Sequence, residues 1–278
     1  MPPITEILSI LGINFAIALA SFVILWRVGC AIKDVSFIDG WWALGLALMA
    51  VTTFFQANGS PERMLLILVL TSIWGLRLGL YILWRWRKHG PDRRYVKMLE
   101  RAHEAKGWSF SKASWRMVFM TQAPILWATS LPVQLGQMST TPVEVGVLGW
   151  ACAGLVIFGI CFESLADYQL VRFKADPANA GKVFDKGLWR YTRHPNYFGD
   201  LCTWFGLFGI AAETTLGLFG IVGPLLLLVM FLKYSGGPSY EKRLTYHRPG
   251  YADYIARTSS LIPWPPKPAG TVETKSAA

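Results

Sequence analysis

Residues 64–88 read MLLILVLTSIWGLRLGLYILWRWRK, an apolar segment that ends in three basic residues. Before that basic end, residues 64–84 contain one charged side chain, Arg77. About 20 consecutive apolar residues suffice for a helix to cross a bilayer. Lysine and arginine gather on the cytoplasmic side of such helices. The segment therefore predicts a transmembrane helix whose carboxyl end faces the cytoplasm.

The rest of the chain repeats this pattern. With 53% hydrophobic residues among 278, it is more apolar than an ordinary soluble domain. We expect one all-α integral membrane domain over residues 1–268 with seven transmembrane helices, followed by a disordered tail at 269–278. Pro124 and Pro132 are expected to break the fourth span. The expected spans are 4–26, 35–55, 64–84, 118–135, 145–166, 197–212 and 216–233.

The distribution of positive charge predicts the orientation. With the N-terminus outside and seven crossings, 25 of the 27 Lys and Arg residues fall in cytoplasmic segments. Arg63 alone is expected outside, and Arg77 alone within a span. This asymmetry predicts an external N-terminus and a cytoplasmic C-terminus. We therefore expect a multi-pass membrane protein whose cofactor site faces the cytoplasm.

Several classes of protein are disfavoured by the same sequence. The basic residues are dispersed through short loops, which disfavours nucleic-acid binding. The four cysteines lie in or beside apolar segments without a C-x-x-C spacing, so we expect buried thiols rather than disulfides. The four histidines lie on different loops, so no metal site is expected.

The densest polar region spans residues 163–200. Glu163, Asp167 and Lys174 lie at i, i+4 and i+11, which places them on one face of a helix. Asp176 and Pro177 then predict the end of that helix. The following segment, GLWRYTRHPNY at 187–197, combines aromatic rings with arginine and asparagine, which suits a ligand with phosphates and rings. An interfacial belt of aromatic and arginine residues is the alternative.

A second polar group lies in the third span. Arg77, Tyr81, Arg85 and Lys88 are separated by 4, 4 and 3 residues and share one helical face. Arg77 is about two turns inside the membrane, where a cation needs a partner. That partner could be the phosphates of a dinucleotide or a carboxylate such as Asp39 or Asp200.

Asp39 itself begins the second span and precedes two tryptophans, Trp41 and Trp42. An acid among large rings could donate a proton within a pocket. A helix cap or an ion pair with Arg77 explains the residue equally well.

Residues 193–200, RHPNYFGD, resemble the R-H-P-N-Y-x-G-D signature of sterol C14 reductases and the lamin B receptor. The pattern from Asp167 through Lys174 to Asn196 and Asp200 is also similar to that of steroid 5α-reductases. The chain further resembles the DUF1295 branch of this superfamily, in DV at 34–35, DGW at 39–41 and the C-terminal GY, Y, RT and IPW elements. The resemblance covers nearly the whole chain, most specifically 163–264.

This resemblance implies a seven-span membrane reductase that holds NADPH in its cytoplasmic half. The expected reaction is hydride transfer to a polarised carbon–carbon double bond in a lipid or steroid-like enone. The expected partners are the bilayer and a small lipophilic substrate. The predicted cofactor-binding residues are Arg77, Arg85, Glu163, Asp167, Lys174, Tyr191, Arg193, His194, Asn196, Tyr197, Asp200, Glu241, Tyr251, Tyr254 and Arg257.

The catalytic residues are predicted by elimination. Steroid 5α-reductases carry a Gln–Glu pair in the second span, whereas here Gln56 has no glutamate beside it. Asp39 and Tyr81 are the remaining polar donors at membrane depth, and we predict that they form the donor pair, with Asp39 slightly favoured.

Two rival functions stay open. Isoprenylcysteine and phospholipid methyltransferases share a similar R-H-P-x-Y-x-G and bind S-adenosylmethionine, although Asn196 and Asp200 resemble the reductases. A lipid-binding protein that has kept the fold without the chemistry is the other rival. Substrate identity, the face of hydride attack and the oligomeric state are not encoded in any recognisable motif.

Overall fold

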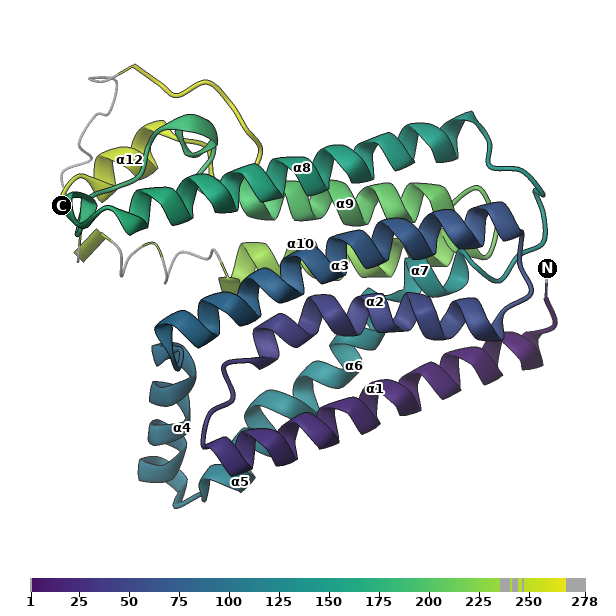
Figure 1. Cartoon of the computed structure of the whole chain (residues 1–278), viewed down its shortest axis with the longest axis horizontal. Coiled ribbons are helices and arrows are strands. Elements are labelled where there is room, and N and C mark those ends of the chain that lie inside the picture. The colour runs from purple at the N-terminus through teal and green to yellow at the C-terminus, as the bar shows by residue number, and fades with distance from the viewer. Residues whose placement is uncertain (1, 236–240, 242–244, 247, 269–278) are drawn as a thin grey trace, which may run out of the picture. The chain divides into compact units, whose positions relative to one another are not determined.

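The computed structural model describes residues 2–235, 241, 245–246 and 248–268 (Figure 1). The described residues form helices and connections, and their only β pairing is an isolated bridge between Thr192 and Ser259. This confirms the predicted all-α class. The tail at 269–278, predicted to be disordered, lies outside the described residues.

Among the described residues, four helices are long and apolar enough to cross a membrane. They correspond to the first, second, third and fifth predicted spans, and each of the longest three continues beyond the apolar stretch. In α3 and α8, basic side chains in the last turn favour this continuation because they complement the helix dipole. The four helices are α1 (Ile4–Ile32), α2 (Ile38–Gln56), α3 (Pro61–His89) and α8 (Val147–Ala175).

The fourth predicted span is interrupted beside one of its two prolines but not at the other. A π-helical turn at Trp115–Phe119 follows α5 (Phe110–Ser114) and leads directly into α6 (Met120–Thr129). Pro124 lies inside α6, so the predicted break there is wrong. Proline is tolerated inside such helices when neighbouring groups compensate for the lost backbone hydrogen bond. The chain breaks instead at Ser130, before α7 (Leu131–Leu135), which carries Pro132 in its first turn.

The last two predicted spans are helical but shorter than the four long helices. The sixth corresponds to α9 (Pro195–Ala211). The seventh consists of a 3₁₀ turn at Gly217–Ile221, α10 (Val222–Met230) and a π turn at Phe231–Ser235. The seven-span count and its orientation therefore stay predictions.

The chain divides into two compact units. Unit 1 consists of 1–153 and 206–226, and unit 2 consists of 154–205 and 227–278. The segments alternate along the sequence, so α8, α9 and α10 each contribute to both units. The single domain predicted over 1–268 stays a prediction.

Within unit 1, α2 and α3 pack along each other at small residues (Figure 1). A β-carbon at Gly75 would lie 2.6 Å from the carbonyl oxygen of Ala43, and one at Gly79 would lie 3.0 Å from that of Gly40. Glycines four residues apart allow this close approach between membrane helices. The pair holds the start of α2 against the glycine face of α3.

Two buried polar groups stabilise the opposite end of unit 1. The Asn14 amide donates to the Thr53 hydroxyl and the Gln134 side chain, both at 2.8 Å. Arg63 is fully buried, and its guanidinium donates to the carbonyl oxygens of residues 136, 139 and 142. The cation predicted to lie outside is therefore enclosed by the chain, because carbonyl oxygens replace its water.

A helix that the sequence analysis treated as loop crosses the other end of unit 1. This is α4 (Arg93–Lys106), which runs across the end of α3 (Figure 1). The Asp92 side chain caps it by accepting from the Arg94 amide at 2.8 Å. Its Leu99 and Ala102 are buried. Its length and capping are those of an ordinary amphipathic helix.

Candidate functional site

The candidate site in unit 2 is built around a close crossing of α8 and α9. A β-carbon at Gly199 would lie 2.7 Å from the Glu163 backbone nitrogen and 2.8 Å from the Gly159 carbonyl oxygen. Both are backbone atoms, so only glycine permits this approach. The crossing places the first turns of α9 directly beside Glu163.

Three of the predicted cofactor residues at this crossing are buried acids. Glu163, Asp167 and Asp200 are 3%, 5% and 8% exposed. Carboxylates at such depth occur with partners or ligands rather than as ordinary surface charges. Lys174, predicted to share their face, is exposed in the last turn of α8. The structure thus groups the acids and leaves the lysine at the surface.

The loop before α9 is attached to the C-terminal segment. The Thr192 hydroxyl donates to the carbonyl oxygens of Ser260 and Leu261, at 3.1 and 2.9 Å. The Arg193 amide donates to the Ser259 carbonyl at 2.9 Å. Segments about 65 residues apart in sequence therefore form one wall of unit 2.

The Arg193 side chain extends this attachment. Its Nε and Nη2 donate to the two carboxylate oxygens of Glu241, at 2.7 and 3.2 Å. Its Nη1 donates to the carbonyls of Ile255 and Thr258, at 3.1 and 2.5 Å. Four of the five guanidinium N–H groups are therefore engaged by the chain. In this structure Arg193 is a clamp, and its predicted role as a phosphate ligand stays a prediction.

The same clamp determines the charge state of Glu241. Burial alone would raise the pKa of this carboxyl, but the nearby His194 imidazole and Arg193 guanidinium outweigh burial and lower it. Glu241 is therefore a carboxylate at neutral pH.

Three rings stack beside the clamp. The His194 ring lies 5.1 Å from that of Tyr197, which lies 4.4 Å from that of Phe231, and both pairs are nearly parallel. They border a cavity of about 230 Å³ that Arg193 and Glu241 also line. The buried His194 Nε2 makes no hydrogen bond and lies 3.6 Å from the nearer Glu241 oxygen. Because ligand pockets usually exceed about 300 Å³, this cavity suits one ring or sugar rather than a whole dinucleotide.

The remaining predicted residues of unit 2 lie around this wall. Tyr254, in α12 (Tyr251–Arg257), donates through its hydroxyl to the Trp189 carbonyl at 2.5 Å. Tyr251 is buried in the same helix. Tyr191 is exposed by 42%, and its carbonyl accepts from the Trp264 amide. Asn196 is half-buried in the first turn of α9.

The unit 1 residues have their own neighbours. The Arg77 and Arg85 guanidinium groups lie 5.7 and 5.8 Å from the Tyr81 ring, one on each side along α3. This confirms that the three share a helical face. The Lys88 amine lies 5.2 Å from the Trp84 ring instead.

Asp39 is held by residues that the sequence analysis did not connect to it. Its carboxylate pairs with Arg94 at 3.0 Å and accepts a hydrogen bond from the Tyr95 hydroxyl at 2.6 Å. Its ion partner is thus Arg94 on α4, not Arg77 as one alternative held. The role of Asp39 and Tyr81 as a donor pair stays a prediction.

Asp34 is the second acidic residue near the start of α2, and it too has identified partners. Its carboxylate accepts from the Ser36 amide and hydroxyl and, at 2.7 Å, from the indole nitrogen of Trp86. It therefore fastens the turn between α1 and α2 to the end of α3. The spacing of acids gave no signal for Trp86, which lies 52 residues away in sequence.

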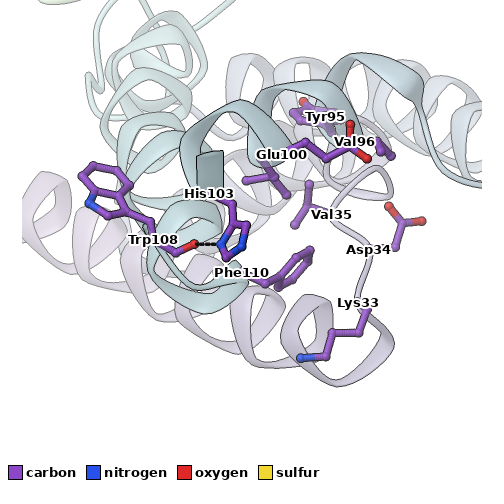
Figure 2. A pocket seen from close by; sticks show the side chains of 10 residues that line it. Lys33, Asp34, Val35, Tyr95, Val96, Glu100, His103, Trp108 and Phe110 are labelled. Atoms are coloured by element: carbon purple, nitrogen blue, oxygen red, sulfur yellow. Dashed lines mark hydrogen bonds between the residues drawn. The ribbon is translucent and has the colours of Figure 1, made fainter. Parts of the chain in front are cut away.

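A larger cavity lies next to this turn, between α4 and the α1–α2 connection (Figure 2). It measures about 370 Å³ and is lined mainly by apolar and aromatic groups, including Val35 and Phe110. In Figure 2 the His103 ring is held by the Trp108 carbonyl, at 3.1 Å. Its size and lining suit a small amphiphilic molecule. The sequence analysis did not predict this cavity.

Comparison with known proteins gives a family match. A family model described as "Protein of unknown function (DUF1295)" matches residues 25–258. An uncharacterized protein of Schizosaccharomyces pombe, C594.04c, is 24% identical over 218 residues, which are 69% of this chain and 62% of that protein. The chain thus covers less than two thirds of this relative's length. No solved structure matches the chain.

Proposed function

Because the match covers most of the chain, the protein belongs to the DUF1295 family, and from this premise we propose that it is a membrane reductase. The proposed enzyme uses NADPH to saturate a polarised carbon–carbon double bond in a lipid or steroid-like substrate. One observation carries the proposal. Residues predicted separately as cofactor ligands, in α8, the 187–197 segment, Glu241 and α12, converge within unit 2.

The chemistry of this convergence suits a pyridine dinucleotide. The stacked rings of His194 and Tyr197 offer a flat surface for a ring. The buried, unbonded His194 Nε2 offers a polar contact in the cavity that those rings border. A dinucleotide also needs cations for its phosphates, and the described part of unit 2 holds exposed arginine and lysine side chains beside this wall.

When bound, NADPH would supply the hydride. The chain's own residues would bind and orient it. The Arg193–Glu241 pair would hold the C-terminal segment against the loop before α9, and the buried acids of α8 and α9 would accept hydrogen bonds from polar groups of the cofactor. Such positioning is the main contribution that a protein makes to hydride transfer.

The proposed orientation puts this site on the cytoplasmic side. The four long apolar helices support a multi-pass protein. The charge asymmetry supports seven spans with an external N-terminus and a cytoplasmic C-terminus. A soluble cofactor would then reach unit 2 directly from the cytoplasm.

Direct binding tests the proposal. We expect the detergent-solubilised protein to quench or enhance NADPH fluorescence in a saturable titration. Asn196→Ala and Asp200→Ala each remove hydrogen-bonding capacity and should weaken binding by about 1–3 kcal/mol. Asp253→Ala, which removes an exposed acid of α12, is the matched control and should leave binding unchanged.

The rival functions predict other outcomes. Saturable binding of S-adenosylmethionine without NADPH binding would support a methyltransferase. Lipid binding with neither cofactor would support a non-catalytic binding protein. Unchanged NADPH affinity in both site variants would refute the proposed cofactor residues.

The proton donor is tested separately. Two guanidinium groups beside Tyr81 would favour the phenolate that remains after proton transfer. Asp39 already accepts hydrogen bonds, which makes Tyr81 the better donor of the pair. Tyr81→Phe should therefore lose most turnover and keep NADPH binding, whereas normal turnover would remove Tyr81 from the proposal.

A further inference from the structure

A second cavity of unit 2, of about 510 Å³, is lined by five charged residues, a glycine and two prolines. Two chain segments form it, one around the 3₁₀ turn at Gly187–Arg190 and one after α12. Its lining residues are Asp185, Lys186, Gly187, Arg190, Arg257, Pro266, Lys267 and Pro268.

The cations of this cavity outnumber its acids. Asp185 is its one carboxylate, and that group pairs with Arg257 at 2.5 Å. Within the described part of the chain, Lys186, Arg190 and Lys267 form no ion pair. Three like charges around one cavity repel each other, and a bound anion would relieve that repulsion.

The backbone that carries these cations is rigidly connected. The Leu188 amide donates to the Gln169 side chain at 3.0 Å, and the Trp189 indole donates to the Ala166 carbonyl at 3.0 Å. The Lys267 amide donates to the Arg257 carbonyl at 3.0 Å. Both walls of the cavity are therefore held in place before any ligand arrives, which lowers the entropic cost of binding.

The basic cavity supplies cations for a phosphate, which the cavity beside Arg193 and Glu241 lacks. Arg193 has only one uncommitted N–H, so it is a poor candidate for a phosphate. Arg190 lies three residues earlier on the same segment, with its side chain exposed to the basic cavity. Lys186, Arg190 and Lys267 are therefore better candidates than Arg193 for holding a phosphate.

We propose that this basic cavity binds a phosphomonoester dianion, whose three oxygens match its three uncommitted cations. On the proposed function, on which this assignment rests, the phosphomonoester is the 2′-phosphate of NADPH. The cavity is then the element that selects NADPH over NADH. A phosphomonoester on a lipid headgroup has the same chemistry and is the other possible source.

The experiment uses soluble probes with the full-length protein in detergent. Adenosine 2′,5′-bisphosphate and 5′-AMP differ only in the 2′-phosphate, and their binding is read by calorimetry. Arg190→Gln and Lys267→Gln should each weaken binding of the bisphosphate at least about tenfold and leave 5′-AMP unchanged. Lys182→Gln, an exposed lysine outside the cavity, is the matched control. The NADPH-to-NADH preference should fall in parallel in the two cavity variants.

The outcomes separate this inference from the proposed function. If NADPH binds tightly but both cavity variants keep the same selectivity as Lys182→Gln, the cavity inference is overturned and the reductase proposal stands. If the wild type binds no dinucleotide, the reductase proposal fails. The cavity inference is then tested with nanodiscs that contain or lack phosphatidic acid. Binding of this lipid that depends on Arg190 and Lys267 supports the phosphomonoester site. If no such binding is found, the cavity inference is overturned.

Discussion

The crossing of α8 and α9 at Gly199 can be tested by adding one methyl group. In Gly199→Ala the new β-carbon would lie 2.7 and 2.8 Å from backbone atoms of α8. An ordinary contact of this kind is about 3.4 Å or longer, so the helices must separate by several tenths of an ångström. Backbone atoms cannot rotate away, so the strain falls on the packing of the whole crossing.

Gly154→Ala provides the matched control on α8. A β-carbon there has nothing within 4 Å. Both changes replace glycine by alanine inside a helix, so the gain of up to about 1 kcal/mol in helix propensity is shared. Overpacking costs about 1–3 kcal/mol. We expect Gly199→Ala to be less stable than Gly154→Ala by that amount.

The assay is thermal unfolding of both purified variants in the same detergent, followed by NADPH titration. Gly199→Ala should unfold at a lower temperature and bind NADPH more weakly, because the separation moves Asp200 away from Glu163. Equal unfolding midpoints for the two variants would refute the close crossing as a structural requirement.

Three further predictions concern other parts of the chain. Arg63→Met removes the donor to the Gly136 and Pro142 carbonyl oxygens and one of two donors to that of Ser139, and it should cost at least about 2 kcal/mol of unfolding free energy. The exposed Arg87→Met should be nearly neutral in the same thermal assay. Because the pKa of Glu241 is lowered, its ion pair with Arg193 stabilises the folded state above the usual carboxyl pKa of 4.5, and this stabilisation is lost as pH falls. In an unfolding series from pH 7 to pH 4, the free energy of unfolding should therefore change less with pH for Glu241→Gln than for the wild type. Identical slopes would contradict the clamp. A reporter that is active only in the cytoplasm should work when fused to the C-terminus and stay silent at the N-terminus, and the reverse result would overturn the proposed orientation.

Hydropathy and charge predicted the long helices well because those features depend on local composition. The ends of the helices were less predictable, as α3 shows by continuing through its basic turn to His89. The break just before Pro132 agrees with one of the two predicted breaks, whereas Pro124 lies inside α6 without ending it. The amphipathic α4 was missed because a polar segment between spans reads as a loop when only span length is considered.

The candidate site was predictable to the level of residue types but not of partners. The 163–200 region was predicted from its density of polar residues, and three of its five acids, Glu163, Asp167 and Asp200, are buried. The bond between Arg193 and Glu241 joins residues 48 apart, and that between Asp39 and Arg94 joins residues 55 apart. Helical spacing reports only neighbours on one helix. Contacts between distant segments therefore needed the three-dimensional structure.

The enclosure of Arg63 has a consequence for biosynthesis. In the proposed orientation this cation crosses the membrane early, as the leading end of the third helix. The first carbonyl that later surrounds it lies 73 residues further along the chain. Until the ribosome has supplied that segment, the charge must stay hydrated at the outer surface, and its burial is a late step of assembly. Since all its acceptors are backbone oxygens, the enclosure of Arg63 depends on the path of that segment and not on the chemistry of its side chains.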